Sequence, residues 1–381
     1  MNIKQPNEDQ AASWEYLPNI NDLLEYLDRE DLMELSKCWK SYKLEKMLEF
    51  LKADLGSKLK FIKKFMLDNM VGCEFAEKLI KLLRNIKTLS IFGYVGACSL
   101  GKGLTTILKG LEHLEHVDFY CIDDKIDDYS TKKQIFPKSI KSLKISYYGS
   151  SNYYNNEYLI YDTIDASYIN LYSLTIVSNR MLQNLSLGMI NLQEVEIIDF
   201  RLMDQSILLK FLKANPQIRK LNTNLSCYNE EVIKTVLSSK YIEYWCIDGI
   251  HWKGIEFNNL QPNYSIKFLE IGDMPPPLIL KIVNACKGLE TIDFEPCRNI
   301  DPIEWSKFER RINNLKLHDN NHLPRYFNEI DHSKQFNQVH IEYYQSIEKF
   351  KEDYNVDKLK NYKFVPLISR SCILKLVNKT D

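Results

Sequence analysis

The sequence predicts an α/β solenoid, a curved parallel sheet of about eleven strand-and-helix repeats preceded by an all-helical segment. Three observations lead to this fold class. A short apolar pattern occurs eleven times at intervals of 21 to 31 residues. Helical spacing of apolar residues separates successive copies. The chain has 381 residues, and because single hydrophobic cores stop growing near ~250–300 residues, it needs several domains or one elongated array.

The repeated pattern is an apolar residue, two variable residues, an apolar residue, one variable residue and a final apolar residue. Its last two apolar positions alternate with variable ones, as in a half-buried strand. Copies run from IKTLSI at 86–91 to FNQVHI at 336–341. The central apolar residues are Leu89, Val117, Leu143, Leu174, Val195, Leu221, Trp245, Leu269, Ile292, Leu315 and Val339. We therefore expect eleven strands with these residues buried.

Helices are expected between the strands, and segments 204–217, 230–239 and 278–288 are the clearest examples. The last of them follows three prolines and ends on a glycine, as helices often do. A unit of this size cannot bury its apolar strand face alone. Neighbouring units must therefore stack in register and merge these faces into one core.

This pattern resembles the leucine-rich repeat over residues 86–341, about two-thirds of the chain, and we assign the repeats to 85–345. That family usually carries Asn or Cys three positions after the last apolar residue of the strand. Such residues are present here as Asn179, Cys297 and Asn320, with Ser226 as a stand-in. The other repeats carry different residues, so the resemblance implies irregular, helix-backed repeats whose polar ladder is interrupted.

Residues 14–45 have apolar residues at helical spacing, with Asp28 where a cap would divide two short helices. The segment resembles an F-box, which docks onto the Skp-type adaptor of cullin-RING ubiquitin ligases. The matching residues are Leu17, Pro18, Leu27, Asp31, Leu32, Leu35 and Trp39. The interval from Leu-Pro to Asp-Leu is shorter than usual. The resemblance implies adaptor contacts from Leu17, Pro18, Leu23, Leu24, Leu27, Leu32, Leu35 and Trp39.

The alternative is that residues 14–80 form only a helical cap that shields the first repeat. We expect a disordered N-terminus at 1–13, a helical linker or N-terminal cap at 46–84, and a C-terminal cap at 346–381. The basic run KLKFIKK at 58–64 is typical of a membrane-surface helix or of the solvated face of a packed helix. The apolar residues on both sides of it favour the packed helix.

Composition excludes several classes of partner. Fifty basic and fifty-one acidic side chains give a formal net charge of −1, so no overall attraction to nucleic acid or an anionic membrane is expected. The amino terminus lacks the apolar run of a secretory signal, and no stretch reaches the ~18 apolar residues of a membrane span. Nine scattered cysteines without a CxxC pair favour reduced thiols. We expect a cytoplasmic or nuclear protein.

Catalytic motifs are weak throughout. GACSLGKG at 96–103 matches a phosphate-binding loop except that Gly103 replaces the Ser or Thr whose hydroxyl would hold Mg²⁺. His113 with His116, and His318 with His322, have spacings that could place two imidazoles on one face of a helix, but neither pair has a third metal ligand nearby. His116, His318 and His340 fall on variable strand positions, where we expect solvent exposure. No Ser, Cys or Lys stands in a nucleophile motif. The sequence indicates a binding protein, not an enzyme, with no metal or cofactor.

The residues that flank the buried strand positions should point to the concave face. These positions hold the acidic residues Asp118, Glu194, Glu196, Asp248, Glu270, Asp293, Glu295 and Glu342, the lysines Lys144, Lys220 and Lys316, and the aromatic residues Phe92, Tyr120, Tyr244 and Phe268. Rings supply contact area and carboxylates orient a partner, so we expect a basic protein substrate. The alternative is a solubilising face. The expected contacts are Tyr120, Glu194, Glu196, Tyr244, Asp248, Phe268, Glu270, Asp293 and Glu295.

Repeats that follow an F-box imply the substrate-recognition subunit of an SCF-type cullin-RING ubiquitin ligase. The Skp-type adaptor and the cullin would assemble on residues 14–45, and the concave face would hold the substrate. Ubiquitin transfer would take place on other subunits, so the chain would contribute only proximity. The alternative is a repeat scaffold or regulatory protein-binding module with no ligase role.

Overall fold

The computed structural model describes residues 52–53, 56–67, 72–92, 101–120, 134–146, 159–198, 203–224, 229–248, 259–272, 274–294, 303–318, 324–343, 346–367 and 370–377. The expected disordered segment 1–13 and the F-box-like segment 14–45 lie outside these ranges. All eight expected adaptor-contact residues therefore lie outside them too.

A single sheet of fourteen strands runs through the described chain. Its strands, in spatial order, are β1 Lys64–Leu67, β2 Thr88–Phe92, β3 His116–Tyr120, β4 Ser142–Ser146, β5 Ser173–Ile176, β6 Glu194–Ile198, β7 Lys220–Asn224, β8 Tyr244–Asp248, β9 Phe268–Ile271, β10 Thr291–Phe294, β11 Ile312–His318, β12 Phe336–Glu342, β14 Ser371–Leu376 and β13 Tyr362–Leu367. β1 to β12 are parallel and follow chain order, whereas β14 is antiparallel to both of its neighbours.

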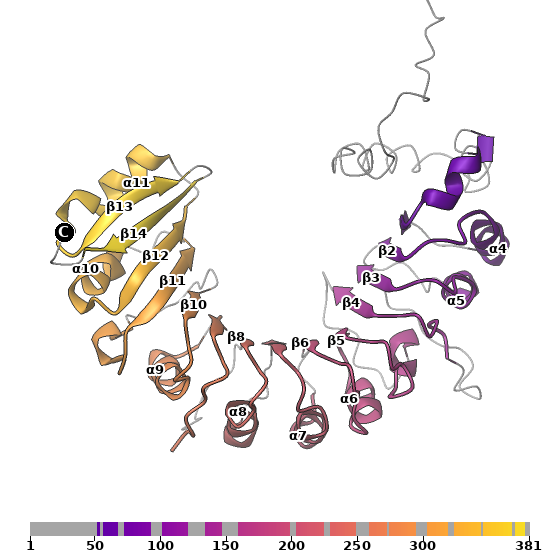
Figure 1. Ribbon diagram of the computed structural model, residues 1–381, viewed down its shortest axis with the longest axis horizontal. Helices are drawn as coiled ribbons and strands as arrows, with labels where there is room; N and C mark the ends of the chain where they lie inside the picture. Colours follow the sequence, from indigo (N-terminus) through magenta and orange to yellow (C-terminus); the bar gives the residue numbers. More distant parts are fainter. Residues whose placement is uncertain are drawn as a thin grey trace, which may run out of the picture.

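The repeats form an open arc, with the strands on its inner, concave side and the helices on its outer, convex side (Figure 1). The α-helices are α4 Cys73–Leu82, α5 Gly101–Gly110, α6 Asn179–Leu185, α7 Gln205–Ala214, α8 Glu230–Leu237, α9 Pro276–Ala285, α10 Pro324–Ser333 and α11 Ile347–Tyr354, and the 3-10 turns are η4 Gly56–Phe61, η5 Ile160–Thr163, η6 Trp305–Lys307 and η7 Val356–Lys358. The arc results because helices are wider than the spacing between strands, so each unit is wedge-shaped.

All eleven expected strands are confirmed as β2 to β12, together with their register. The central apolar residues lie opposite one another from Leu89 in β2 to Val339 in β12. Each exposes at most 3% of its surface. The α/β class and the long curved parallel sheet were therefore predictable from the spacing of apolar residues.

The three clearest helical segments are confirmed as α7, α8 and α9. Local capping explains two of their starts: the side chain of Asp204 accepts hydrogen bonds from the backbone N–H groups of Ser206 and Ile207, and that of Asn229 accepts one from Val232. Such caps satisfy N–H groups that have no partner inside the helix.

The expected helix is replaced by a 3-10 turn in two connections, at η5 and η6. In the second, the ring of Trp305 packs edge-on against Phe294, Phe308 and Phe336, with centroids 5.8, 5.7 and 5.5 Å away. One large aromatic cluster thus fills the volume that helical side chains fill in other units. Periodicity within a single connection could not show this.

The N-terminal end of the sheet differs from expectation. Residues 46–84 were expected to be helical, but Lys64–Leu67 form β1, which pairs in parallel with β2. Phe65 and Leu67 are buried and alternate with exposed residues. A strand of four residues is too short for its alternation to be distinguished from helical spacing in the sequence, and it forms because the edge of β2 is open to pairing.

The C-terminal cap contains α11 and two strands, where one closing strand was expected. β14 covers the side of β12 that a further repeat would occupy, and β13 then forms the outer strand. Pro366 lies in β13, where a residue without an N–H group discourages pairing with another chain. The buried carboxylate of Asp331 in α10 accepts hydrogen bonds from the backbone N–H groups of Lys360 (3.1 Å) and Asn361 (2.8 Å), which fixes the start of β13.

The register of β4 predicts opposite results for two adjacent substitutions. Leu143→Ala should lower the free energy of unfolding by about 2–5 kcal/mol, because Leu143 is 1% exposed and its removal leaves a cavity. Lys144→Ala should change it by less than ~0.5 kcal/mol, because Lys144 is exposed on the concave face. Urea denaturation followed by circular dichroism measures both, and equal effects would contradict the register.

Candidate functional site

The concave face presents the residues that alternate with the buried ones. In β9, for example, Phe268 and Glu270 are half-buried on this face while Leu269 and Ile271 are buried on the other. Eight of the nine residues expected to contact a partner lie at such positions: Tyr120, Glu194, Glu196, Tyr244, Asp248, Phe268, Glu270 and Asp293. Glu295 lies outside the described residues.

Two pairs of aromatic rings stack across neighbouring strands of this face. Phe92 and Tyr120 have ring centroids 4.4 Å apart and are almost parallel. Tyr244 and Phe268 have centroids 4.8 Å apart. The first pair lies on β2 and β3 and the second on β8 and β9, so the structure separates the expected aromatic residues into two sites.

Lysines bracket the second pair. Lys220 Nζ lies 4.9 Å from the ring centroid of Tyr244, and Lys316 Nζ lies 4.9 Å from that of Phe268. Ammonium groups at this distance are attracted to the ring faces. The hydroxyl of Tyr244 donates a hydrogen bond to the Glu270 carboxylate. The result is an ordered stack of Lys220, Tyr244, Phe268 and Lys316, called here the cation–aromatic stack.

A charged network continues from this stack toward the C-terminal end. Lys316 Nζ lies 3.3 Å from one oxygen of Asp293, and His318 Nε2 lies 3.2 Å from the other. His318 Nδ1 is 3.2 Å from Glu342 Oε2. Both ring nitrogens thus face carboxylates, an arrangement that suits the doubly protonated imidazolium. His318 was expected to be solvent-exposed, but it is half-buried between Asp293 and Glu342 because the register aligns three strands.

The pKa values of this network shift in the directions that its contacts require. The hydrogen bond with Asp293 raises the pKa of His318 above its ordinary 6.5, although partial burial opposes this. Burial raises the pKa of Asp293, but the hydrogen bond from His318 and the charge of Lys316 outweigh it, so the net shift is downward. His340 behaves differently, because burial and the charges of Lys316 and Lys375 lower its pKa.

The remaining carboxylates give the middle of the concave face its negative character. Glu194 in β6 is exposed and makes no ion pair in the described part of the chain. Within the described part of the chain, Glu196 accepts hydrogen bonds from the neutral side chains of Thr175 (3.2 Å) and Asn222 (3.5 Å) and forms no ion pair. Asp293 and Glu342, in contrast, are neutralised by neighbouring cations. Glu194 and Glu196 on β6 are therefore two adjacent carboxylates of this face that no cation of the described ranges neutralises.

The described residues give little indication of metal binding, of a membrane-spanning helix or of a reactive thiol. No group of three or more His, Cys, Asp or Glu side chains there is arranged to hold a metal ion. No helix in the same ranges is long and apolar enough to cross a membrane. Burial raises the pKa of the Cys286 and Cys372 thiols to about 12, which makes both poor nucleophiles.

A hollow of about 520 Å³ lies beside α9, away from the concave face. Its lining residues are Asn259, Leu260, Pro262, Leu280, Lys281, Asn284, Ala285, Lys287 and Glu309. Lys287 and Glu309 form an ion pair of 2.5 Å within this lining. None of the residues expected from sequence to bind a partner contributes to the hollow.

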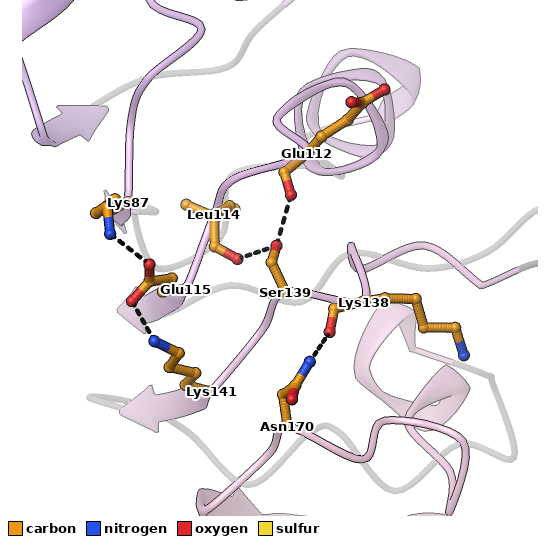
Figure 2. Close-up of polar contacts among 8 residues, drawn as sticks. All are labelled: Lys87, Glu112, Leu114, Glu115, Lys138, Ser139, Lys141 and Asn170. Carbon is orange, nitrogen blue, oxygen red and sulfur yellow. Dashed lines mark hydrogen bonds and ion pairs between the residues drawn. The ribbon is translucent and has the colours of Figure 1, made fainter.

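A second ordered surface, missed from the sequence, lies where each helix or loop turns back into a strand. Glu115, just before β3, forms ion pairs with Lys87 (2.6 Å) and Lys141 (2.7 Å), which precede the neighbouring strands (Figure 2). Hydrogen bonds from Lys141 and Lys87 lower the pKa of Glu115 to about 2. The signal was present in the sequence, since charges of alternating sign precede β2 to β4 (Lys87, Glu115, Lys141) and β7 to β10 (Arg219, Glu243, Lys267, Glu290).

Polar side chains also join each of these turns to the turn before it. Ser139 Oγ donates to the carbonyl groups of Glu112 and Leu114, each at 2.7 Å, and Asn170 Nδ2 donates to that of Lys138 at 2.9 Å (Figure 2). The equivalent position holds Asn85, Ser139, Asn170, Asn191, Gln217 and Ser265, and each donates to a carbonyl of the preceding turn. This ladder lies at the opposite ends of the strands from the Asn or Cys position considered from sequence.

No protein family matches the sequence, and no curated protein matches it. In structure, the chain is similar to the leucine-rich repeat-containing protein LegL7 from Legionella pneumophila, with a TM-score of 0.44 and 10% identity over 77% of this chain and 98% of that one. It is also similar to an internalin, InlF, from Listeria monocytogenes, with a TM-score of 0.28 and 12% identity over 59% of this chain and 65% of that one. Both TM-scores are below 0.5, so neither similarity supports a functional role for this chain.

The two histidines of the concave face should titrate in opposite directions. We expect the pKa of His318 to lie above 6.5 and that of His340 below it, and Asp293→Asn should lower the first. NMR titration of the imidazole resonances measures all three. His340 serves as the internal control, and a His318 pKa at or below that of His340 would contradict the network.

The same shifts set the pH range in which the network stabilises the fold. A raised histidine pKa contributes stability that is complete below 6.5 and lost as the pH rises through the folded value. A lowered carboxyl pKa contributes stability that is complete above 3.8 and lost as the pH falls. The stability advantage over His318→Gln should therefore be largest between pH 3.8 and 6.5.

Proposed function

We propose that this chain is a leucine-rich-repeat scaffold that binds a protein partner on its concave face and performs no catalysis itself. The observation that carries the proposal is the cation–aromatic stack on β7 to β11. Its rings are half-buried and held in place by Lys220, Lys316 and Glu270, so little conformational freedom is lost when a partner covers them. Tyrosine and other large rings dominate the energy of many protein interfaces.

The charge near the stack favours a partner with basic side chains. Glu194 and Glu196 are negative and lack ion-pair partners in the described ranges, and they lie on β6, next to the strand that carries Lys220. Carboxylates of this kind speed the encounter with a basic segment and fix its orientation. The partner would place lysine or arginine near β6 and an apolar group against Tyr244 and Phe268.

Charge reversal at β6 tests this proposal. On an array of lysine- and arginine-rich peptides, the wild-type chain should bind a subset, and Glu194→Lys with Glu196→Lys should weaken that binding about tenfold or more. Tyr244→Ala should weaken it by a similar factor, which corresponds to about 1.4 kcal/mol.

The matched control is Glu77→Lys with Glu329→Lys, which reverses two exposed charges on the convex helices α4 and α10. This variant should keep the wild-type peptide pattern. A pattern equally altered in both double variants, or in neither, would favour a concave face that only improves solubility.

A second candidate function follows from the F-box resemblance of residues 14–45. In it, the scaffold is the substrate-recognition subunit of an SCF-type ubiquitin ligase and acts in the cytoplasm or nucleus. The supporting observation is the sequence pattern alone: Leu17 and Pro18 precede a helical run that ends near Trp39. The concave face would then hold the ligase substrate, so this role refines the scaffold.

Co-purification with a Skp-type adaptor tests the ligase role. We expect the full chain to form a complex with the adaptor, and Leu17→Ala with Pro18→Ala to abolish it, because these residues match the Leu-Pro of the F-box pattern. The double variant should retain the peptide pattern of the concave face. Failure of the wild-type chain to bind the adaptor would leave the scaffold as the function and remove the ligase.

A further inference from the structure

One edge of the solenoid is strongly basic although the chain as a whole is nearly neutral. We define the helix-to-strand edge by the residues five, four and two positions before the central buried residue of each strand from β1 to β12. All of these residues are described. They include thirteen basic residues, Lys60, Lys63, Arg84, Lys87, Lys138, Lys141, Arg219, Lys240, Lys267, Lys287, Arg310, Arg311 and Lys334, and four acidic ones, Glu112, Glu115, Glu243 and Glu290. The excess of nine positive charges contrasts with a formal net charge of −1.

Much of this charge is not neutralised within the protein. Glu115 neutralises part of Lys87 and Lys141, and Glu243 lies 3.9 Å from Arg219. Lys287 pairs with Glu309 at 2.5 Å. The other nine edge cations make no ion pair within the described ranges: Lys60, Lys63, Arg84, Lys138, Lys240, Lys267, Arg310, Arg311 and Lys334. The edge therefore carries unpaired positive charge that can attract an anionic partner.

Exposed apolar side chains are concentrated on the same edge. Ten large hydrophobic side chains are exposed in the described part of the chain. Six belong to the turns that lead into β5, β6, β8 and β9: Ile169 (61% exposed), Tyr172 (37%), Leu187 (86%), Ile190 (80%), Tyr241 (55%) and Tyr264 (73%). Phe61, before β1, and Val377, after the antiparallel β14, lie on the same side of the sheet. Six of the ten occupy the positions that define the edge: Phe61, Ile169, Tyr172, Ile190, Tyr241 and Tyr264. Leu187, in the turn before β6, and Val377, directly after β14, flank the edge without occupying those positions. Single exposed apolar residues are common, but this is a concentration on one side of the sheet.

The helix-to-strand edge is an ordered, extended surface whose turns lie at a common height along the sheet. Each turn is hydrogen-bonded to its neighbour, as described for Ser139 and Asn170 (Figure 2). The strands are parallel and in register, so equivalent turns lie at the same height along the sheet. Twelve strands at ~4.8 Å spacing extend over roughly 50 Å of arc. A partner that neutralises the whole edge must be equally extended.

We propose that the helix-to-strand edge binds the surface of an anionic lipid bilayer. Leu187, Ile190 and Ile169 would enter the headgroup region, and the lysines and arginines on either side would contact the anionic headgroups. Tyr241 and Tyr264 suit the same depth, where tyrosine is enriched in membrane proteins. The binding is peripheral and requires no membrane-spanning helix.

Two other extended anionic partners fit the edge less well. A nucleic acid could neutralise the lysines and stack on the tyrosines, but its phosphate backbone has no apolar layer to receive Leu187 and Ile190. An acidic protein would need an apolar strip and an acidic flank over the same ~50 Å. A bilayer supplies both layers everywhere on its surface.

This orientation leaves the concave face accessible. The edge residues directly precede the parallel strands, so a bilayer bound to the edge would lie across the N-terminal ends of these strands. The cation–aromatic stack would then face the aqueous space beside the solenoid and not the membrane. Membrane binding and partner binding are therefore separate properties.

Sedimentation of the full chain with vesicles tests the proposal. Vesicles of phosphatidylcholine containing phosphatidylserine should bind the chain at least about tenfold more strongly than phosphatidylcholine alone, and high salt should remove most of the difference. Lys240→Glu with Lys267→Glu should weaken binding on the order of thirtyfold, because two attractions become repulsions. Leu187→Ser with Ile190→Ser should weaken it by at least about tenfold.

Matched controls separate the edge from general effects of charge and hydrophobicity. Lys102→Glu with Lys349→Glu reverses two exposed charges in the first turns of the convex helices α5 and α11, at the other ends of the units. Met66→Ser with Leu367→Ser removes the two exposed apolar residues that neither occupy nor flank the edge. Both control variants should bind the anionic vesicles as the wild type does. Circular dichroism confirms that every variant is folded.

Three outcomes would overturn the proposal: no binding to either vesicle, equal binding to both at low salt, or edge variants that match their controls. Binding of polyglutamate without binding of vesicles would also overturn it and would assign the edge to an acidic protein. Glu194→Lys with Glu196→Lys should leave vesicle binding intact, so failure of the concave-face proposal is distinguishable from failure of this one.

Discussion

The whole structure depends on one constraint, namely that no unit of this chain can bury its own apolar strand face. The central residue of each strand, from Leu89 to Val339, is buried only because the next strand lies beside it in the same register. Stability is thus a sum of contacts between neighbours. The ends of the array need different solutions, and β1 at one end and the β14–β13 pair at the other supply them.

Where the chain turns between strand and helix, backbone N–H and carbonyl groups have no hydrogen-bond partner in the sheet. Buried asparagine side chains supply the missing partners. Asn215 Oδ1 accepts from Met189 N at 2.7 Å while its Nδ2 donates to Leu185 O at 3.1 Å. Asn263 links two units in the same way through Leu237. Because unpaired buried polar groups are costly, these bonds fix how one unit can lie on the next, and they make the helix-to-strand edge rigid.

The same register sorts charge onto different surfaces. The concave face concentrates carboxylates near Glu194 and Glu196, whereas the helix-to-strand edge collects lysine and arginine beside exposed aliphatic residues such as Leu187. A net charge of −1 conceals this separation. The two surfaces are nearly perpendicular, since one lies along the strands and the other at their ends. The surface proposed to bind a protein and the surface proposed to bind lipid therefore do not overlap.

The sequence by itself determined the repeat, its eleven strands and their register, because burial imposes a period of two that is visible at residues such as Leu269 and Ile271. It also determined which residues face the concave side. Only the tertiary structure decided which of these meet: it stacks Tyr244 on Phe268, places His318 between Asp293 and Glu342, and aligns turn residues as far apart as Lys63 and Lys334 on one edge. The physical reason is that each unit specifies its own strand locally, whereas a surface is composed of residues from many units. It exists only after the units have stacked.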